Sequence, residues 1–219
     1  MAGPVGTEDV TEVRIGPLGL QGLLRLPATA GALVLFAHGS GSGRLSPRNN
    51  HVAQALRGAG LATLLFDLLT EEESADRANV FDIELLAERL AMATAWVRLE
   101  GDLKDFPVGY FGASTGAAAA LVAAARSPVP VGAIVSRGGR PDMAGPVLGE
   151  VRAPTLLIVG GRDTSVLELN RDAFARLRCV KSLQIVPGAT HLFEEPGALD
   201  QVIDLARHWL VDHLIGKPS

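Results

Sequence analysis

One serine of the chain lies in a sequence that is typical of a catalytic nucleophile. Ser114 is the centre of Gly112-Ala113-Ser114-Thr115-Gly116, which follows an apolar run and precedes an alanine-rich segment. A G-x-S-x-G pentapeptide between a strand and a helix holds its serine on a sharp, strained turn, where a β-carbon at either glycine would collide with a neighbouring element. The helix expected from Thr115 directs its unpaired N–H groups and positive dipole end at the serine. The alternative is a chance glycine-serine turn.

An aspartate and a histidine follow in the order that such a nucleophile requires. Asp163 ends the sequence GGRD after a later apolar run, and His191 lies in GATHLF after the last one. Alone, Asp163 could cap the next helix, and a loop histidine is often incidental. The order serine, aspartate, histidine is that of α/β-hydrolases, so we expect a triad in which His191 takes the Ser114 proton and Asp163 orients the imidazole.

A glycine-rich loop at 38–43 (HGSGSG) follows another apolar run. Such a loop could hold a phosphate, but neither G-x-G-x-x-G nor a Walker lysine is present. In a hydrolase this loop supplies one N–H of the oxyanion hole, and we assign the two donors to the backbones of Ser40 and Thr115. His38 is then expected to brace the loop rather than to act as a second base.

Four arginines lie where they could contact a substrate. Arg44 and Arg48 follow the glycine-rich loop, and Arg137 and Arg140 follow an expected strand. Guanidinium groups bind carboxylates and phosphates through two parallel hydrogen bonds, so these residues are candidate substrate-binding groups. The alternative is that they are solvated or paired with carboxylates of the protein itself.

The elements that must position these residues alternate along the chain. Short apolar runs without alternation indicate strands that are buried on both faces, as in a parallel sheet. Segments with helical spacing lie between them, and this order predicts an α/β fold with a mostly parallel, doubly wound sheet. The expected strands are 32–37, 61–66, 108–111, 131–135, 155–159 and 183–186, preceded by an antiparallel edge hairpin of 13–15 and 19–26. The expected helices are 49–58, 81–99, 115–125, 166–177 and 196–214. Ligands bind at the carboxyl ends of the strands in such sheets, and the candidate site residues named above follow the expected strands.

The domain organisation follows from length and spacing. The chain has 219 residues and no repeat or linker, so we expect a single domain over 1–219 with residues 1–10 flexible. The segment between strands 131–135 and 155–159 is too short for a large cap. The acidic run Glu71-Glu72-Glu73 is expected on a solvated loop.

Composition excludes several classes of partner. The net charge of −4 gives no reason to expect binding to nucleic acid or to an anionic membrane. The one cysteine rules out an intrachain disulfide and a cysteine zinc cluster, and no convincing ligand set for a metal or an organic cofactor is present. The N-terminus lacks the features of a signal peptide, and no apolar run could span a bilayer. These features predict a soluble cytoplasmic protein that acts on a small molecule; they leave the oligomeric state open.

The chain resembles the dienelactone hydrolase branch of the α/β-hydrolases from about residue 13 to residue 214. The resemblance is carried by FAHGSG at 36–41, GASTG at 112–116, VSRGGRPD at 135–142, GGRD at 160–163 and THLFEEP at 190–196. Members that open dienelactones have a cysteine nucleophile and a glutamate in the first loop. Here Ser114 and His38-Gly39-Ser40 stand at these places, so the chain looks more like a small serine esterase on the same scaffold.

The predicted reaction is hydrolysis of a carboxylic ester or lactone through an acyl-enzyme. A phosphoester or phosphotriester hydrolase could use the same three residues, and so could an amide or carbon–carbon hydrolase. The alternative outside the enzymes is a non-catalytic binding protein with a hydrolase fold.

Overall fold

The chain forms one eight-stranded sheet, which the computed structural model describes over residues 10–216. The strand order is β1-β2-β4-β3-β5-β6-β7-β8. Strands β1 and β2 pair antiparallel, β2 pairs antiparallel with β4, and all other pairs are parallel. The strands are β1 (Val10–Ile15), β2 (Leu20–Arg25), β3 (Ala32–Ala37), β4 (Leu61–Phe66), β5 (Val108–Ala113), β6 (Ala133–Arg137), β7 (Thr155–Gly160) and β8 (Lys181–Val186).

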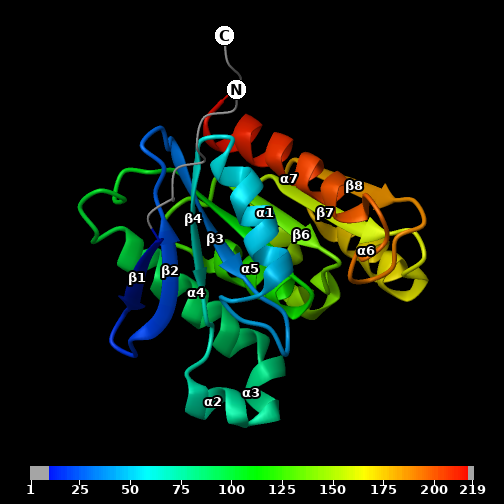
Figure 1. Ribbon diagram of the computed structural model, residues 1–219. Coiled ribbons are helices and arrows are strands. Elements are labelled where there is room, and N and C mark those ends of the chain that lie inside the picture. Colours follow the sequence, from blue (N-terminus) through cyan, green and yellow to red (C-terminus); the bar gives the residue numbers. More distant parts are fainter. Residues whose placement is uncertain (1–9, 217–219) are drawn as a thin grey trace, which may run out of the picture.

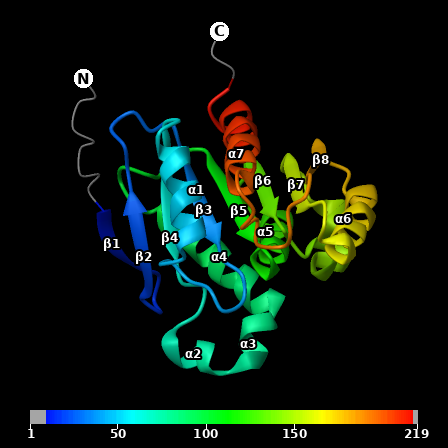
Figure 2. The ribbon, with the colours of Figure 1, turned by 45° about the vertical axis from the view of Figure 1, so that its right-hand side comes forward.

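Helices cover both faces of the sheet, as Figures 1 and 2 show. Two of them, α1 and α7, lie on one face, and α4, α5 and α6 lie on the other together with the 3-10 segment η1. The short helices α2 and α3 project beyond the sheet and are covered by no other layer. The helices are α1 (Pro47–Arg57), α2 (Glu71–Ala75), α3 (Arg77–Phe81), α4 (Ile83–Val97), α5 (Thr115–Arg126), η1 (Pro141–Glu150), α6 (Thr164–Arg176) and α7 (Ala198–Leu214).

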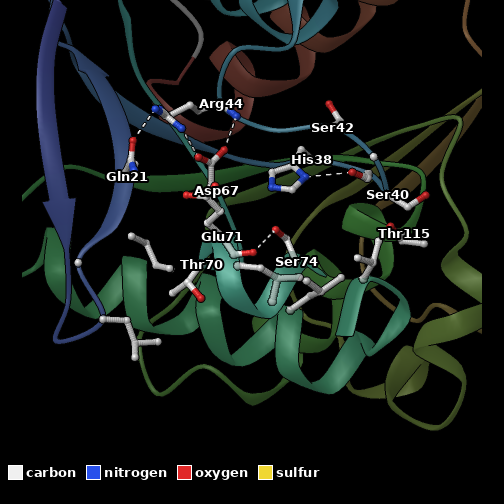
Figure 3. A pocket seen from close by; sticks show the side chains of 18 of the residues that line it. Gln21, His38, Ser40, Ser42, Arg44, Asp67, Thr70, Glu71, Ser74 and Thr115 are labelled. Carbon is white, nitrogen blue, oxygen red and sulfur yellow. Dashed lines mark hydrogen bonds and ion pairs between the residues drawn. The ribbon is translucent and has the colours of Figure 1, made fainter. Parts of the chain in front are cut away.

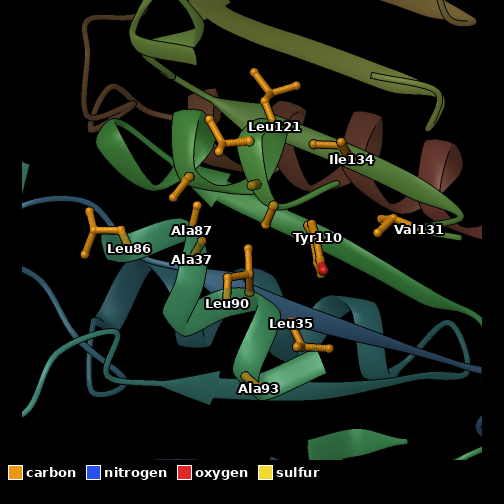
Figure 4. Close-up of a cluster of buried hydrophobic side chains, with 14 of the residues drawn as sticks. Leu35, Ala37, Leu86, Ala87, Leu90, Ala93, Tyr110, Leu121, Val131 and Ile134 are labelled. Atoms are coloured by element: carbon orange, nitrogen blue, oxygen red, sulfur yellow. The ribbon is translucent and has the colours of Figure 1, made fainter. Parts of the chain in front are cut away.

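The central strands are apolar on both sides because helices cover both sides. Every residue of β3, β4 and β5 is buried. Figure 4 shows one of the two cores, where α4 and α5 pack on the sheet around Tyr110 and Leu35. Small alanines on α5 allow a close approach, and the Tyr110 hydroxyl is paired with Thr94 Oγ1 at 2.8 Å. Burial of this phenol raises its pKa to about 12, so it stays neutral.

The expected fold class is confirmed: the sheet is mostly parallel, with an antiparallel edge hairpin, and residues 10–216 form no large cap. One difference within the sheet concerns β6, which begins and ends two residues later than expected. The strand therefore includes Ser136 and Arg137, two polar residues that an apolar run cannot predict. Their backbones pair with β5 and β7, which explains the extension.

The acidic run at 71–73 was expected on a loop, and this expectation is wrong. These glutamates form the first turn of α2, because Thr70 and Glu73 make a reciprocal capping box. The Thr70 hydroxyl accepts from the Glu73 N–H at 3.1 Å, and the Glu73 carboxylate accepts from the Thr70 N–H at 2.9 Å. Carboxylates at a helix N-terminus also interact favourably with its dipole.

Most of the segment that was expected to be flexible, residues 1–9, lies outside the described residues, and Val10 begins β1. Over 10–216, none of the helices combines the length and the apolarity that a membrane span requires.

Candidate functional site

The backbone of Ser114 adopts a strained conformation at the turn between β5 and α5. Its φ is 51° and its ψ is −122°, a backbone conformation that residues other than glycine rarely adopt. The flanking glycines make this turn possible. A β-carbon on Gly116 would lie 2.1 Å from the carbonyl oxygen of Ala37, and one on Gly112 would lie 2.5 Å from the Cα of Ala117. The expected steric reason for the two glycines is therefore present in the structure.

Asp163 and His191 meet at the same edge of the sheet. Asp163 follows β7 and His191 lies between β8 and α7; the His191 Nδ1 lies 2.7 Å from Asp163 Oδ2. Asp163 stands at the N-cap of α6, but its side chain makes no capping bond. The carboxylate is 13% exposed and the imidazole 39% exposed, so the pair is partly buried. The carboxylate thus contacts the imidazole and does not cap the helix.

The loop that carries His191 is stabilised by a contact between Thr190 and Glu195, on either side of the histidine. Both carboxylate oxygens of Glu195 accept from the Thr190 N–H at 3.1 Å, and Phe193 is buried with a φ of 56°. Hydrogen bonding to Thr190 keeps the pKa of Glu195 below its usual value, so the bracing group stays ionised. The loop packs against Gly138, where an added β-carbon would lie 3.0 Å from the carbonyl oxygen of His191.

The backbone of Ser114 is bonded to Arg137, and the residue after Arg137 lies beside His191. The Ser114 N–H donates to the carbonyl of Arg137 at 3.4 Å. A β-carbon on the next residue, Gly138, would lie 3.5 Å from His191 Nδ1. Among the described residues, the Ser114 hydroxyl makes no hydrogen bond to His191 or to any other residue. Hydrogen bonds of this kind often tighten only when substrate is present.

The glycine-rich loop, which carries one of the two predicted oxyanion donors, approaches Ser114. A β-carbon on Gly39 would lie 2.9 Å from the Ser114 Cβ, so the glycine-rich loop contacts the serine directly. Within residues 10–216 neither the Ser40 N–H nor the Thr115 N–H donates a hydrogen bond. Both residues line the same cavity.

His38 braces this loop, as expected. Its Nε2 accepts from the Leu68 N–H at 3.0 Å, so its Nδ1 carries the proton and donates to the carbonyl of Gly39 at 3.0 Å. Burial lowers the pKa of His38, although the Gly39 carbonyl and Asp67 oppose the shift. Both ring nitrogens of the neutral imidazole are therefore hydrogen-bonded, and the ring links the residues after β4 to the loop. His38 has no free lone pair that could accept the proton of Ser114.

His38 should make the stability of the fold depend on pH. Below about pH 6.5, the ordinary pKa of histidine, the unfolded chain binds a proton that the buried native imidazole resists, so stability is lost as pH falls toward the lowered native pKa. We expect the melting temperature to drop more between about pH 7.5 and about pH 5.5 in the wild type than in His38→Gln. The other titrating groups are common to both proteins and cancel. An equal drop would contradict this account of His38.

A cavity of about 680 Å³ opens from the oxyanion loop toward the edge hairpin. Figure 3 labels the polar side chains of its lining, and apolar residues such as Leu69 and Val80 line it as well. The hairpin, the end of β4 and helix α2 form its other walls. It is lined by Arg14, Leu18, Gly19, Leu20, Gln21, His38, Gly39, Ser40, Gly41, Ser42, Arg44, Asp67, Leu69, Thr70, Glu71, Ser74, Val80, Leu86 and Thr115.

The four arginines expected to bind substrate lie in different surroundings. Arg44 lines the cavity and forms an ion pair with Asp67. Arg48 is paired with Glu194 at 2.9 Å. Arg140 makes two hydrogen bonds to Asp142, at 2.9 and 2.8 Å, which is the structural pairing that the sequence left open. Arg137 alone of the four has no carboxylate partner among the described residues.

Several residues of the cavity were missed by reasoning from sequence. Asp67 follows β4 directly, and its position at the carboxyl end of a strand was a usable signal. Arg14 and Gln21 reach the cavity from the edge hairpin, and no local pattern marks them. Over residues 10–216, no group of three or more His, Cys, Asp or Glu side chains is placed to hold a metal ion.

Comparison with known proteins gives two strong similarities. A dienelactone hydrolase from Anabaena variabilis, whose structure is solved, is 54% identical with a TM-score of 0.90, over 95% of this chain and 98% of that chain. A Mycobacterium tuberculosis protein, whose name describes it as a candidate phosphoribosyl transferase, is 61% identical over 213 residues. The match covers 97% of this chain and 48% of that protein, so the chain spans about half the length of this relative.

A more distant similarity concerns the fold alone. Est1E from Butyrivibrio proteoclasticus matches 95% of this chain with a TM-score of 0.78 and 15% identity. No protein-family model matches the chain.

Proposed function

Because the chain belongs to the dienelactone hydrolase branch of the α/β-hydrolases, we propose that it is a serine hydrolase that cleaves a carboxylic ester or lactone. Ser114 attacks the carbonyl carbon while His191 takes its proton. The tetrahedral intermediate expels the alcohol, which His191 protonates, and leaves an acyl group on Ser114. A water molecule, deprotonated by His191, then releases the acid.

One observation carries this proposal: the Asp163 carboxylate binds His191 Nδ1 at 2.7 Å instead of capping α6. That contact would keep the proton on Nδ1 and leave Nε2 free to accept the serine proton. The strained backbone of Ser114 adds support, since such strain concentrates at functional sites.

The backbone N–H groups of Ser40 and Thr115 are proposed to bind the oxyanion. Both are unpaired within the described residues, and the loop that carries Ser40 contacts Ser114. A preorganised donor of this kind stabilises the transition state by about 3–4 kcal/mol. The cavity beside them is lined by polar side chains such as Arg44 and Asp67 and by apolar ones such as Leu69 and Val80, so it can contact both polar and apolar parts of a substrate.

The test combines labelling with a substrate panel. A fluorophosphonate probe should label the wild type at Ser114, and the panel of p-nitrophenyl esters, lactones and phosphate esters should show turnover of esters or lactones. Ser182→Ala, on the edge strand β8, is the matched serine control and should be labelled normally. No labelling and no turnover would favour the non-catalytic alternative, and turnover of phosphate esters alone would favour a phosphoester hydrolase.

The name of the M. tuberculosis relative suggests a different reaction, phosphoribosyl transfer. That name describes a protein about twice as long as the matched region. Consumption of 5-phosphoribosyl diphosphate by this chain, unaffected by Ser114→Ala, would favour the transferase and count against the hydrolase.

A further inference from the structure

One segment, residues 137–140, is hydrogen-bonded to both backbone groups of Ser114. It joins the end of β6 to the start of η1. The Ser114 N–H donates to the carbonyl of Arg137 at 3.4 Å, and the Ser114 carbonyl accepts from the N–H of Arg140 at 3.1 Å. That carbonyl also accepts from Ala117 in the first turn of α5. The strained backbone conformation of Ser114 therefore depends on where the 137–140 segment lies.

The same segment lies against His191. Gly138 has a φ of 51°, and a β-carbon there would lie 3.0 Å from the carbonyl oxygen of His191. The Gly138 N–H donates to the carbonyl of Ile158 on β7 at 2.8 Å. A displacement of the segment would thus change the surroundings of both the proposed nucleophile and the proposed base.

The next residue of the segment, Gly139, is bonded to Asn170, a fully buried side chain of α6. The Asn170 Nδ2 donates to the carbonyl of Gly139 at 3.0 Å and to that of Val166, one turn earlier in the helix, at 2.8 Å. Both amide hydrogens are used in this way. The reverse orientation of the amide would place its oxygen against two carbonyl oxygens, so the chemistry of the site fixes which atom is the nitrogen.

This arrangement has a cost in stability. Asn170 Oδ1 is buried without a hydrogen-bond partner among the described residues, and buried polar atoms are normally paired. Space is also restricted, because a β-carbon on Gly139 would lie 2.0 Å from Ser136 Oγ. An apolar side chain at position 170 would avoid the unpaired oxygen. The bond to Gly139 therefore explains the amide better than packing does.

We propose that Asn170 is a positioning residue, which holds the 137–140 segment where it supports the strained turn at Ser114 and packs against His191. The inference rests on the proposed hydrolase function and adds a residue that touches neither the substrate nor the reacting atoms. Asn170 lies about two turns after Asp163, the N-cap of the same helix. Helix α6 then positions Asp163 at its start and, through Asn170, the segment that supports the other two residues.

The first experiment removes the bond to Gly139 alone. Threonine has nearly the volume of asparagine, and in a helix its hydroxyl bonds the carbonyl four residues earlier, here Val166, but it is too short to reach Gly139. We expect Asn170→Thr to lower kcat on the best ester by about ten- to a hundredfold with KM nearly unchanged, the scale of a small misplacement of reacting groups. Fluorophosphonate labelling of Ser114 should slow in parallel. Asn170→Ser makes the same change without a branched β-carbon and replaces the threonine variant if that protein does not fold.

The control for a loss of stability is Thr94→Val, on α4. The Thr94 hydroxyl is buried and bonded to the carbonyl of Leu90 at 2.9 Å and to the Tyr110 hydroxyl at 2.8 Å, and makes no printed contact with the 137–140 segment. Thr94→Val should lower the melting temperature and leave kcat and KM unchanged. Equal losses of kcat in the two variants, or an unchanged kcat in Asn170→Thr, would overturn the proposal.

The second experiment needs no substrate. Ser114→Gly should melt higher than Ser114→Ala, because glycine relieves the strain of the turn. If Asn170 maintains that strain, the difference should become smaller in the Asn170→Thr background. A merely structural role would lower both melting temperatures equally and leave the difference unchanged, which overturns the proposal. No difference in the wild-type background overturns it too, since there would be no strain to maintain. If the wild type cleaves no ester but the difference narrows, the hydrolase function fails and the support of the turn by Asn170 stands.

Discussion

Replacing Ser114 by alanine should reduce ester or lactone hydrolysis by about 10⁵-fold or more, the scale on which a nucleophile contributes in a serine hydrolase. The hydroxyl is the only group lost, and it makes no hydrogen bond among the described residues, so the fold should be retained. The loss is measured as kcat on the best ester of the panel, with Ser182→Ala as the control. Near-normal turnover of Ser114→Ala would contradict the assignment.

The backbone of Ser114 permits a sharper comparison with a second variant, Ser114→Gly. Alanine keeps the β-carbon in a region of backbone space that favours glycine, at φ 51° and ψ −122°. Glycine removes that strain, which is worth about 1–3 kcal/mol at such positions. We therefore expect Ser114→Gly to melt several degrees higher than Ser114→Ala, while both are inactive. Equal melting temperatures would show that the turn stores no strain at this residue.

Replacing Asp163 by asparagine should lower kcat by about 10⁴-fold, by analogy with the effect in other Ser-His-Asp hydrolases. The carboxylate accepts a hydrogen bond from His191 Nδ1, whereas the amide nitrogen of asparagine would donate to it. Donation favours the tautomer with its proton on Nε2, which cannot accept the serine proton. The side chains have nearly the same volume, so the melting temperature should change little.

The matched control for this variant is Asp172→Asn, an exposed carboxylate on the same helix α6. It should retain full activity. If Asp163→Asn stayed within tenfold of the wild-type kcat, Asp163 would not orient the base. A large fall in melting temperature would show instead that the Asp163–His191 pair holds the two loops together.

The sequence alone determined the fold class and the order of the candidate catalytic residues. Buried parallel strands need apolar side chains on both faces, so β3, β4 and β7 were visible as apolar runs. The position of Ser114 was also visible, because the turn between β5 and α5 requires glycine at 112 and 116. These are local constraints, and a local pattern can record them.

The tertiary structure decided how the polar residues are paired. Asp163 could have capped α6 or bound His191, and only the approach of the loop after β8 selects the second partner. The four arginines have the same chemistry in the sequence. Three of them meet a carboxylate, from as near as Asp142 and as far as Glu194, and Arg137 meets none among the described residues. The reason is physical: charge pairing depends on distances in space between side chains that the chain brings together from separate strands, helices and loops.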